Sequence, residues 1–197
     1  MSRALEVVFV ARGVPSLGYK TYFMVPTEKP DAFPNACSVK LDAPEGQSPK
    51  RIMGADQLEN EFYRVTVDRA TGRIALFDKD LNTTVAKNIE IVASEERGGN
   101  SLSVELQTGR TVIFTVNRVE LEENNPVRAV VRIDGEIAGV SVVQKLSLYG
   151  GVKRVDLENT VDWKQGRFMK IEQLIPHTCS EAQIRYGIPF GSAAGSD

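Results

Sequence analysis

The sequence predicts an all-β fold, an antiparallel β-sandwich, and three observations point to it. Apolar residues recur at every second position in several segments. Clusters of Gly, Asn, Asp and Pro separate these segments, as turns separate the strands of hairpins and meanders. No long window has the apolar spacing of an amphipathic helix. Strands of this kind have one apolar face each, and two such sheets bury those faces against each other.

The alternation is clearest in four segments, where apolar residues share one face and polar or charged residues take the other. We expect strands at residues 112–116, 127–134, 140–148 and 154–161. The turns expected between β-like runs are residues 70–72, 96–100, 108–109, 123–126, 134–135 and 150–151. Residues 57–63 are the best helical candidate, but aromatic and β-branched residues follow them, which favours the start of a strand.

The chain divides into three parts. Residues 1–26 contain two strand-like runs, 6–11 and 18–25, which we expect to form a hairpin belonging to a smaller β domain. Residues 27–51 contain Pro30, Pro34, Pro44 and Pro49 among polar residues, which is typical of a linker. Residues 52–197 form the large sandwich, and the small-residue ending at 190–197 suggests a truncated domain.

Composition excludes several partners. The net charge is −2 with both signs interspersed, so no nucleic-acid or membrane surface is expected. No apolar run is long enough for a membrane helix. Cys37 and Cys179 lie far apart and are expected to be free thiols. No secretory signal is visible, which favours the cytoplasm; if the chain is a piece of a longer protein, its compartment stays open.

Three residues are candidates for carbohydrate binding: Trp163, Asp162 and His177. Trp163 follows Asp162 at the end of an expected strand, where an aromatic ring beside a carboxylate suits a pyranose. The alternative is that Trp163 fills the core. His177 is the sole histidine and follows Pro176; the alternative for it is a loop residue bonded to backbone. No catalytic or metal-ligating set is expected in the chain.

Four groups of residues, in order along the chain, match sequence motifs of a known protein family. They are VPSLGYKTY (14–22), LENEFYRVTVD with GRI and DKD (58–80), VDLENTVDW (155–163) and YGIPFG (186–191). Together they resemble the C-terminal region of family 38 glycoside hydrolases, the α-mannosidases. This resemblance implies a galactose-mutarotase-like supersandwich.

The resemblance also implies a function. The chain would be a non-catalytic accessory sandwich that braces a catalytic barrel and lines its sugar cleft, with a mannoside-type glycan and the barrel as partners. The family's catalytic aspartate and its zinc, held by histidines and aspartates, would lie in that barrel. We therefore expect no cofactor in this chain and no activity from it alone. The family's sandwich can lend an aromatic hydroxyl to the active site, but no tyrosine occurs between Leu81 and Leu148.

Two alternatives come from other classes of protein. One is a free-standing carbohydrate-binding module that uses Trp163. The other is an aldose 1-epimerase, which needs a general base and a general acid, here Glu172 and His177.

Overall fold

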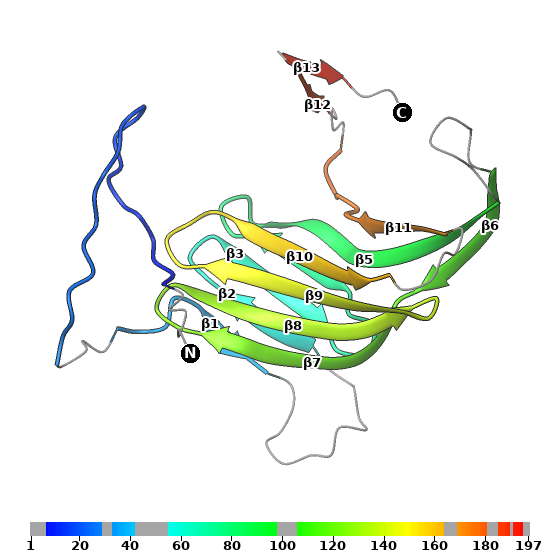
Figure 1. Ribbon diagram of the computed structural model, residues 1–197, viewed down its shortest axis with the longest axis horizontal. Helices are drawn as coiled ribbons and strands as arrows, with labels where there is room; N and C mark the ends of the chain where they lie inside the picture. The colour runs from blue at the N-terminus through cyan, green and yellow to red at the C-terminus, as the bar shows by residue number, and fades with distance from the viewer. Residues whose placement is uncertain are drawn as a thin grey trace, which may run out of the picture.

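The computed structural model describes residues 7–28, 33–41, 55–97, 106–163, 169–180, 185–189 and 191–194. All regular structure in these residues is β, and the strands pair antiparallel. Two sheets are stacked face to face, with a small two-stranded sheet standing apart from them (Figure 1). The all-β sandwich predicted from the sequence is confirmed.

The first sheet has the order β1-β2-β3-β4-β5-β11, and β6 also pairs with β5. The long strand β5 holds this sheet together, because β4 and β6 pair with it and β11 returns to it from the far end of the sequence. The strands of this first sheet are β1 (Ser38–Lys40), β2 (Ala55–Glu59), β3 (Tyr63–Asp68), β4 (Ile74–Asp78), β5 (Thr83–Arg97), β6 (Leu106–Ile113) and β11 (Met169–Leu174).

The second sheet is a meander with the order β10-β9-β8-β7. Its strands are β7 (Thr115–Asn124), β8 (Arg128–Ile137), β9 (Val140–Tyr149) and β10 (Val155–Asp162). A third sheet pairs β12 (Arg185–Ile188) with β13 (Gly191–Ala194). Because β6 belongs to one large sheet and β7 to the other, the chain changes sheets at Phe114, as strands do at the corner of a sandwich.

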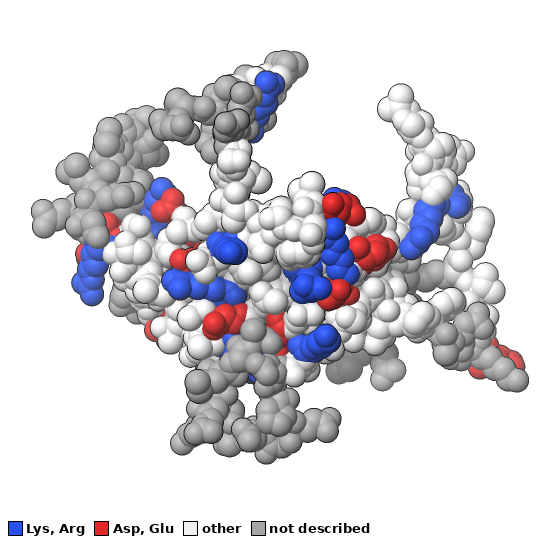
Figure 2. Space-filling model, turned by 180° about the vertical axis from the view of Figure 1, so that it is seen from behind, with Lys and Arg blue, Asp and Glu red and all other residues white. Residues whose placement is uncertain are grey.

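Charged side chains of both signs are interspersed on the face shown in Figure 2, without a patch of one sign. This matches the nearly balanced composition of the chain. No helix in the described part of the chain could cross a membrane.

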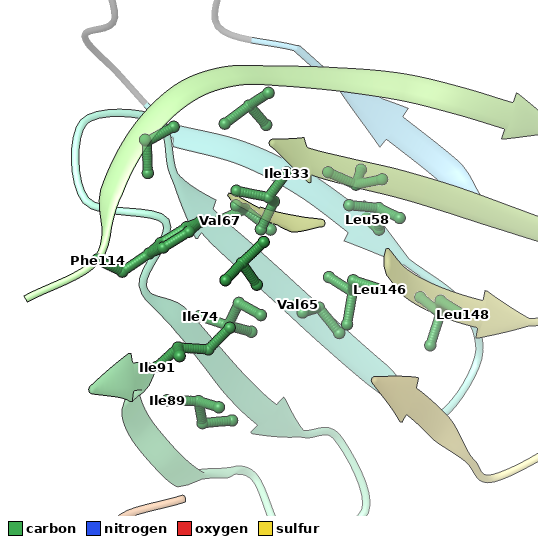
Figure 3. Close-up of a cluster of buried hydrophobic side chains, with 14 of the residues drawn as sticks. Leu58, Val65, Val67, Ile74, Ile89, Ile91, Phe114, Ile133, Leu146 and Leu148 are labelled. Carbon is green, nitrogen blue, oxygen red and sulfur yellow. The ribbon is translucent and has the colours of Figure 1, made fainter. Parts of the chain in front are cut away.

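The core lies between the two large sheets, where the apolar side chains point toward one another (Figure 3). Leu58, Val65 and Val67 of the first sheet are fully buried, as are Ile133 and Leu146 of the second. Full burial stabilises each such side chain by about 1.5–3 kcal/mol relative to exposure in water. The alternation in β8 and β9 therefore predicted the buried face correctly.

The turns were predicted in part. Residues 70–72 and 150–151 lie between strands, as do residues 125 and 126 of the turn expected at 123–126, whereas residues 123 and 124 still pair within β7. The predicted turn at Asp134-Gly135 is wrong, because both residues pair within β8. The turn is at Ala138 and Gly139, which both have positive φ, as a two-residue hairpin requires. Gly135 serves packing instead: a Cβ there would overlap the Phe114 ring and the Thr115 carbonyl oxygen.

The turn expected at residues 108–109 is also wrong, because β6 runs through it. Residues 96 and 97 of the turn expected at 96–100 belong to β5, and residues 98–100 lie outside the described residues. Gly109 lies in an irregular stretch of sheet, because the pairing of β5 with β6 shifts register between Ser94, opposite Thr111, and Glu96, opposite Gln107.

Residues 7–28 form a projecting arm rather than the predicted pair of strands, since no strand is assigned in them. The arm still doubles back on itself, with a turn closed by Gly18 N donating to Pro15 O at 3.1 Å (Figure 1). Its two halves are joined by the rings of Phe9 and Tyr22, 5.0 Å apart, and by the Tyr22 hydroxyl donating to Arg12 O. Contacts through side chains replace the backbone ladder that a strand pair needs.

Strand β1 lies within the stretch 27–51 that was expected to be a linker, and it pairs with β2. Just before it, Cys37 is buried and its Sγ donates to Leu148 O at 3.3 Å, which ties this stretch to the sandwich. Pro30, Pro44 and Pro49 lie outside the described residues. Both cysteines are free, as predicted.

Candidate functional site

A pocket of about 390 Å³ opens at one edge of the sandwich, where β10 of the second sheet faces β5 and β11 of the first. We name it the Trp163 pocket. Its volume is in the range of small-molecule sites, about 300–1,000 Å³. It is lined by Ile91, Asn159, Val161, Trp163, Ile171 and Gln173.

The pocket forms because the inner face of β10 is not fully covered. Val155 and Leu157 pack against the core, but Val161 is 37% exposed and Trp163 is 40% exposed. Odd-numbered residues of β10 share one face, since side chains alternate along a strand. The face that packs at the start of β10 therefore becomes the wall of a pocket at its end.

Three amide side chains meet beside this wall, and we name Gln144, Asn159 and Gln173 the amide triad. Gln144 Nε2 donates to Asn159 Oδ1 at 2.9 Å and to Gln173 Oε1 at 2.7 Å. Asn159 Nδ2 donates to Gln173 Oε1 at 3.1 Å. Gln173 Nε2 donates to the backbone oxygen of Glu90 on β5 at 3.0 Å. The triad thus connects both sheets at the open edge.

Gln144 is only 1% exposed, in a core of aliphatic residues. It lies between Val142 and Leu146 on the inner face of β9, directly opposite Asn159 on β10. A buried amide is costly unless its polar atoms are bonded, and here both hydrogens of its NH₂ group have acceptors. Gln144 therefore fixes the positions of the two amides that line the pocket.

Sequence reasoning missed the amide triad, although a signal was present. Gln144 interrupts the apolar ladder of residues 140–148, and Asn159 interrupts that of residues 155–161. A polar residue on an otherwise buried face needs a partner, so the two interruptions pointed to each other. Gln173 belongs to a strand that the alternation did not identify.

The three predicted carbohydrate-binding residues do not come together. Trp163 lines the pocket, whereas Asp162 is exposed and is not a lining residue. Neighbouring residues in an extended chain point to opposite sides, which separates the two side chains. The proposed pairing of ring and carboxylate is therefore not supported by this geometry.

His177 lies beyond the end of β11, where it forms an isolated bridge with Ala86. Backbone bonds on either side hold this stretch along β5: Lys87 N donates to Pro176 O, and Thr178 N donates to Val85 O. His177 lies four positions beyond Gln173, the lining residue nearest to it in sequence, which is roughly 13 Å in extended chain. His177 is exposed and is not a lining residue of the Trp163 pocket.

Glu172, the carboxylate considered for an epimerase, forms an ion pair with Lys170, with Oε1 and Nζ 2.7 Å apart. Because Ile171 and Gln173 on either side of it line the pocket, Glu172 points to the opposite face of β11. The described residues do not bring Glu172 and His177 into one pocket as an acid–base pair.

Among the residues that the structure describes, no group of three or more His, Cys, Asp and Glu could hold a metal ion. The perturbed carboxylates are in ion pairs away from the Trp163 pocket. Hydrogen bonds from Lys79 and Arg64 lower the pKa of Glu59, and hydrogen bonding by Arg128 lowers the pKa of Glu123. Such surface pairs are common supports of a sheet and do not indicate catalysis.

A second polar cluster lies where the arm meets the sandwich. The Tyr149 hydroxyl donates to Asp156 Oδ2 at 2.9 Å, and Arg154 Nε lies 2.5 Å from Asp156 Oδ1. Burial raises the pKa of Asp156, but the bonds from Arg154 and Tyr149 outweigh it and leave that pKa lowered. This cluster and Val8–Ala11 of the arm line a cavity of about 320 Å³. The base of the arm is therefore seated against β9 and β10.

Comparison with known proteins gives one clear result. The family model described as the glycosyl hydrolases family 38 C-terminal domain matches residues 58–194. No curated protein matches the chain. The matched residues extend from β2 to β13 and include the Trp163 pocket and the amide triad. The chain therefore belongs to the family of C-terminal domains of family 38 glycosyl hydrolases.

Proposed function

We propose that this chain is the non-catalytic accessory sandwich of an α-mannosidase-like glycoside hydrolase, and that it braces the catalytic barrel and lines its sugar cleft. Membership of the family supports the hydrolase context. The observation that carries the bracing role is the arm, which exposes a run of large apolar side chains outside the core between the two sheets.

The arm is anchored at its base and exposed beyond it. Val8 and Phe9 help to line the cavity with Tyr149 and Asp156. Farther along, the exposed large apolar residues are Val14, Leu17, Tyr19, Tyr22, Phe23, Met24 and Val25. In Figure 2 the arm stands away from the sandwich on the right and is mostly uncharged. A cluster of large exposed apolar side chains on one segment is typical of a protein–protein contact.

The chemistry of a family 38 enzyme would come from the partner in this proposal. A glycosidase needs two carboxyl groups placed across the scissile bond. In this chain the carboxylates with perturbed pKa values are committed to ion pairs, and the one histidine lies outside the pocket. Zinc, like the catalytic aspartate, would belong to the barrel.

The bracing role is tested by mixing this chain with a separately produced family 38 catalytic domain from the same source. Size-exclusion chromatography should show a complex, and the melting temperature of the catalytic domain should rise. The double variant Tyr19→Ser/Phe23→Ser should weaken the complex about tenfold or more, since aromatic anchors dominate such contacts. Leu81→Ser is the matched control, because Leu81 is 65% exposed on the sandwich itself. No complex with the unmodified chain would contradict the proposal.

The non-catalytic role has its own test. The chain alone, with added zinc, should not hydrolyse a chromogenic α-mannoside above the rate of a buffer blank. Zinc-dependent turnover that survives repurification would mean that the carboxylates of this chain form an active site.

A further inference from the structure

We propose that the Trp163 pocket binds one uncharged pyranose ring, with Trp163 against a face of the sugar and the amide triad bonding its hydroxyl groups. This deepens the proposed function and rests on it for the sugar class, since it assigns the sugar contact of the accessory domain to a defined place. Neither the family match nor the bracing role specifies this pocket.

The apolar part of the pocket suits the carbon face of a sugar. Trp163 is 40% exposed as a residue and supplies an aromatic ring, and Ile91, Val161 and Ile171 supply aliphatic surface beside it. A pyranose has axial C–H groups on its faces and hydroxyls around its rim. A half-exposed tryptophan next to polar groups is the arrangement that such an amphipathic ring requires.

The polar part of the pocket has hydrogen-bonding capacity to spare. Each primary amide has two N–H donors. Among the described residues, Asn159 Nδ2 donates to Gln173 Oε1 and Gln173 Nε2 donates to Glu90 O. One N–H on each amide therefore remains for a guest, and Asn159 Oδ1, which accepts from Gln144, has a second lone pair. Two adjacent amides can bond a pair of neighbouring hydroxyls.

Gln144 makes this arrangement rigid. Its NH₂ group holds the oxygen atoms of both Asn159 and Gln173, and it is buried. The two amides are thus oriented before a ligand arrives, which reduces the ordering cost of binding. Two members of this network, Asn159 and Gln173, line the pocket beside the chain's one tryptophan. A network that only stabilised the fold would not need to lie there.

The charge of the pocket selects the class of sugar. The described lining residues are aliphatic, aromatic or amide, with no charged group among them. A carboxylate or sulfate on the sugar would lose water without gaining a cation. An apolar side chain of another protein would fill the aliphatic part but would leave the amide N–H groups without acceptors. A neutral pyranose satisfies both parts.

Trp163 is the chain's only tryptophan, so its fluorescence reports on the pocket directly. Titration of the full chain with methyl α-D-mannopyranoside, excited where tryptophan alone absorbs, should give a saturable change in intensity. Methyl glucoside tests how narrow the preference is, and saturable binding of either neutral sugar supports the proposal. Glucuronate should bind at least about tenfold more weakly because of its buried charge. Cyclohexanol, which has a similar ring with one hydroxyl, should also bind more weakly, because it leaves the amides unbonded.

Variants separate the two parts of the pocket. Asn159→Leu and Gln173→Leu should each weaken sugar binding about tenfold by removing a hydrogen bond to the guest. Trp163→Ala should abolish binding measured by calorimetry. Gln57→Leu is the matched control, because Gln57 is a half-buried amide on β2 outside the pocket. Thermal unfolding of each variant checks that the fold is retained.

The proposal is overturned if neither neutral sugar gives a saturable response, or if cyclohexanol responds as strongly as the sugars. It is also overturned if Asn159→Leu and Gln173→Leu, both folded, bind like the Gln57→Leu control. These results are independent of complex formation with a catalytic domain. Sugar binding without a complex would refute only the brace, and a complex without sugar binding would refute only the pocket.

Discussion

The closed middle of the sandwich and its open edge are built from the same pattern of residues but differ in what they do. On β9, Val142 and Leu146 are fully buried between the sheets. On β10, Val161 continues an equivalent apolar ladder, yet it is 37% exposed in the Trp163 pocket. Alternation therefore specifies which face of a strand is apolar, whereas the opposing sheet decides whether that face becomes core or binding surface.

The largest expected effect comes from breaking the closed middle. Leu146→Ala should lower the free energy of unfolding by about 2–5 kcal/mol, since it leaves a cavity among fully buried neighbours. Val161→Ala at the open edge should cost less than about 1 kcal/mol, because much of its side chain already contacts water. Urea denaturation of both variants measures the difference. Equal losses would mean that the two regions are packed alike.

A smaller effect is expected at Gln144, where the two regions meet. Gln144→Leu should cost about 1 kcal/mol, because the oxygens of Asn159 and Gln173 each lose a donor while water reaches the pocket side. The sugar response of Trp163 should fall by a larger proportion than the stability, because the two amides lose their orientation. A variant that is less stable but binds sugar normally would show that Gln144 supports only the fold.

The smallest expected effect on stability comes from lowering the pH. It should act on the ion pairs of the sheets and leave the Trp163 pocket unchanged. The pKa values of Glu59 and Glu123 are lowered in the folded protein by their bonds to basic side chains. A lowered folded pKa adds stability above the unfolded pKa, about 4.3 for Glu, and that stability is lost as pH falls through the folded pKa. The melting temperature should therefore drop below about pH 4, and less so in Glu59→Gln/Glu123→Gln.

Sugar binding should not follow the same pH dependence while the chain stays folded. The described residues of the Trp163 pocket include no group that titrates in this range. Fluorescence titrations at pH 7 and at about pH 5 should give the same affinity. A change across this interval would mean that a titrating group outside the described lining contributes to the pocket.

The sequence predicted the fold wherever side-chain alternation is coupled to burial. Residues 127–134 and 140–148 match β8 and β9 because each has one face in the core. It failed at Gly135, where a glycine that looks like a turn instead makes room for Phe114. It also failed in the arm, where apolar runs without a neighbouring sheet do not form a backbone ladder.

Of the residues that line the Trp163 pocket, the sequence pointed only to Trp163. Trp163 was identified as a residue that could contact sugar, and the structure places it on a pocket wall. The sequence did not predict Asn159 and Gln173 as site residues, because they lie on different sheets. Only their shared hydrogen bonds with Gln144 show that they form a group. Proximity in sequence favoured Asp162 and chemical type favoured His177, but neither property fixes the direction of a side chain.

The place of β11 in the first sheet has a consequence for how the chain folds. The meander β7–β10 pairs neighbours in sequence, so its loops close at little entropic cost and its pairing can begin as soon as those strands exist. Strand β11 instead pairs with β5 across the whole meander, Met169 opposite Glu95. During synthesis the edge of β5 must wait for β11, and Gln173 arrives with it. The pocket is thus completed late, and a chain interrupted before β11 leaves the edge of β5 open to pairing with another molecule.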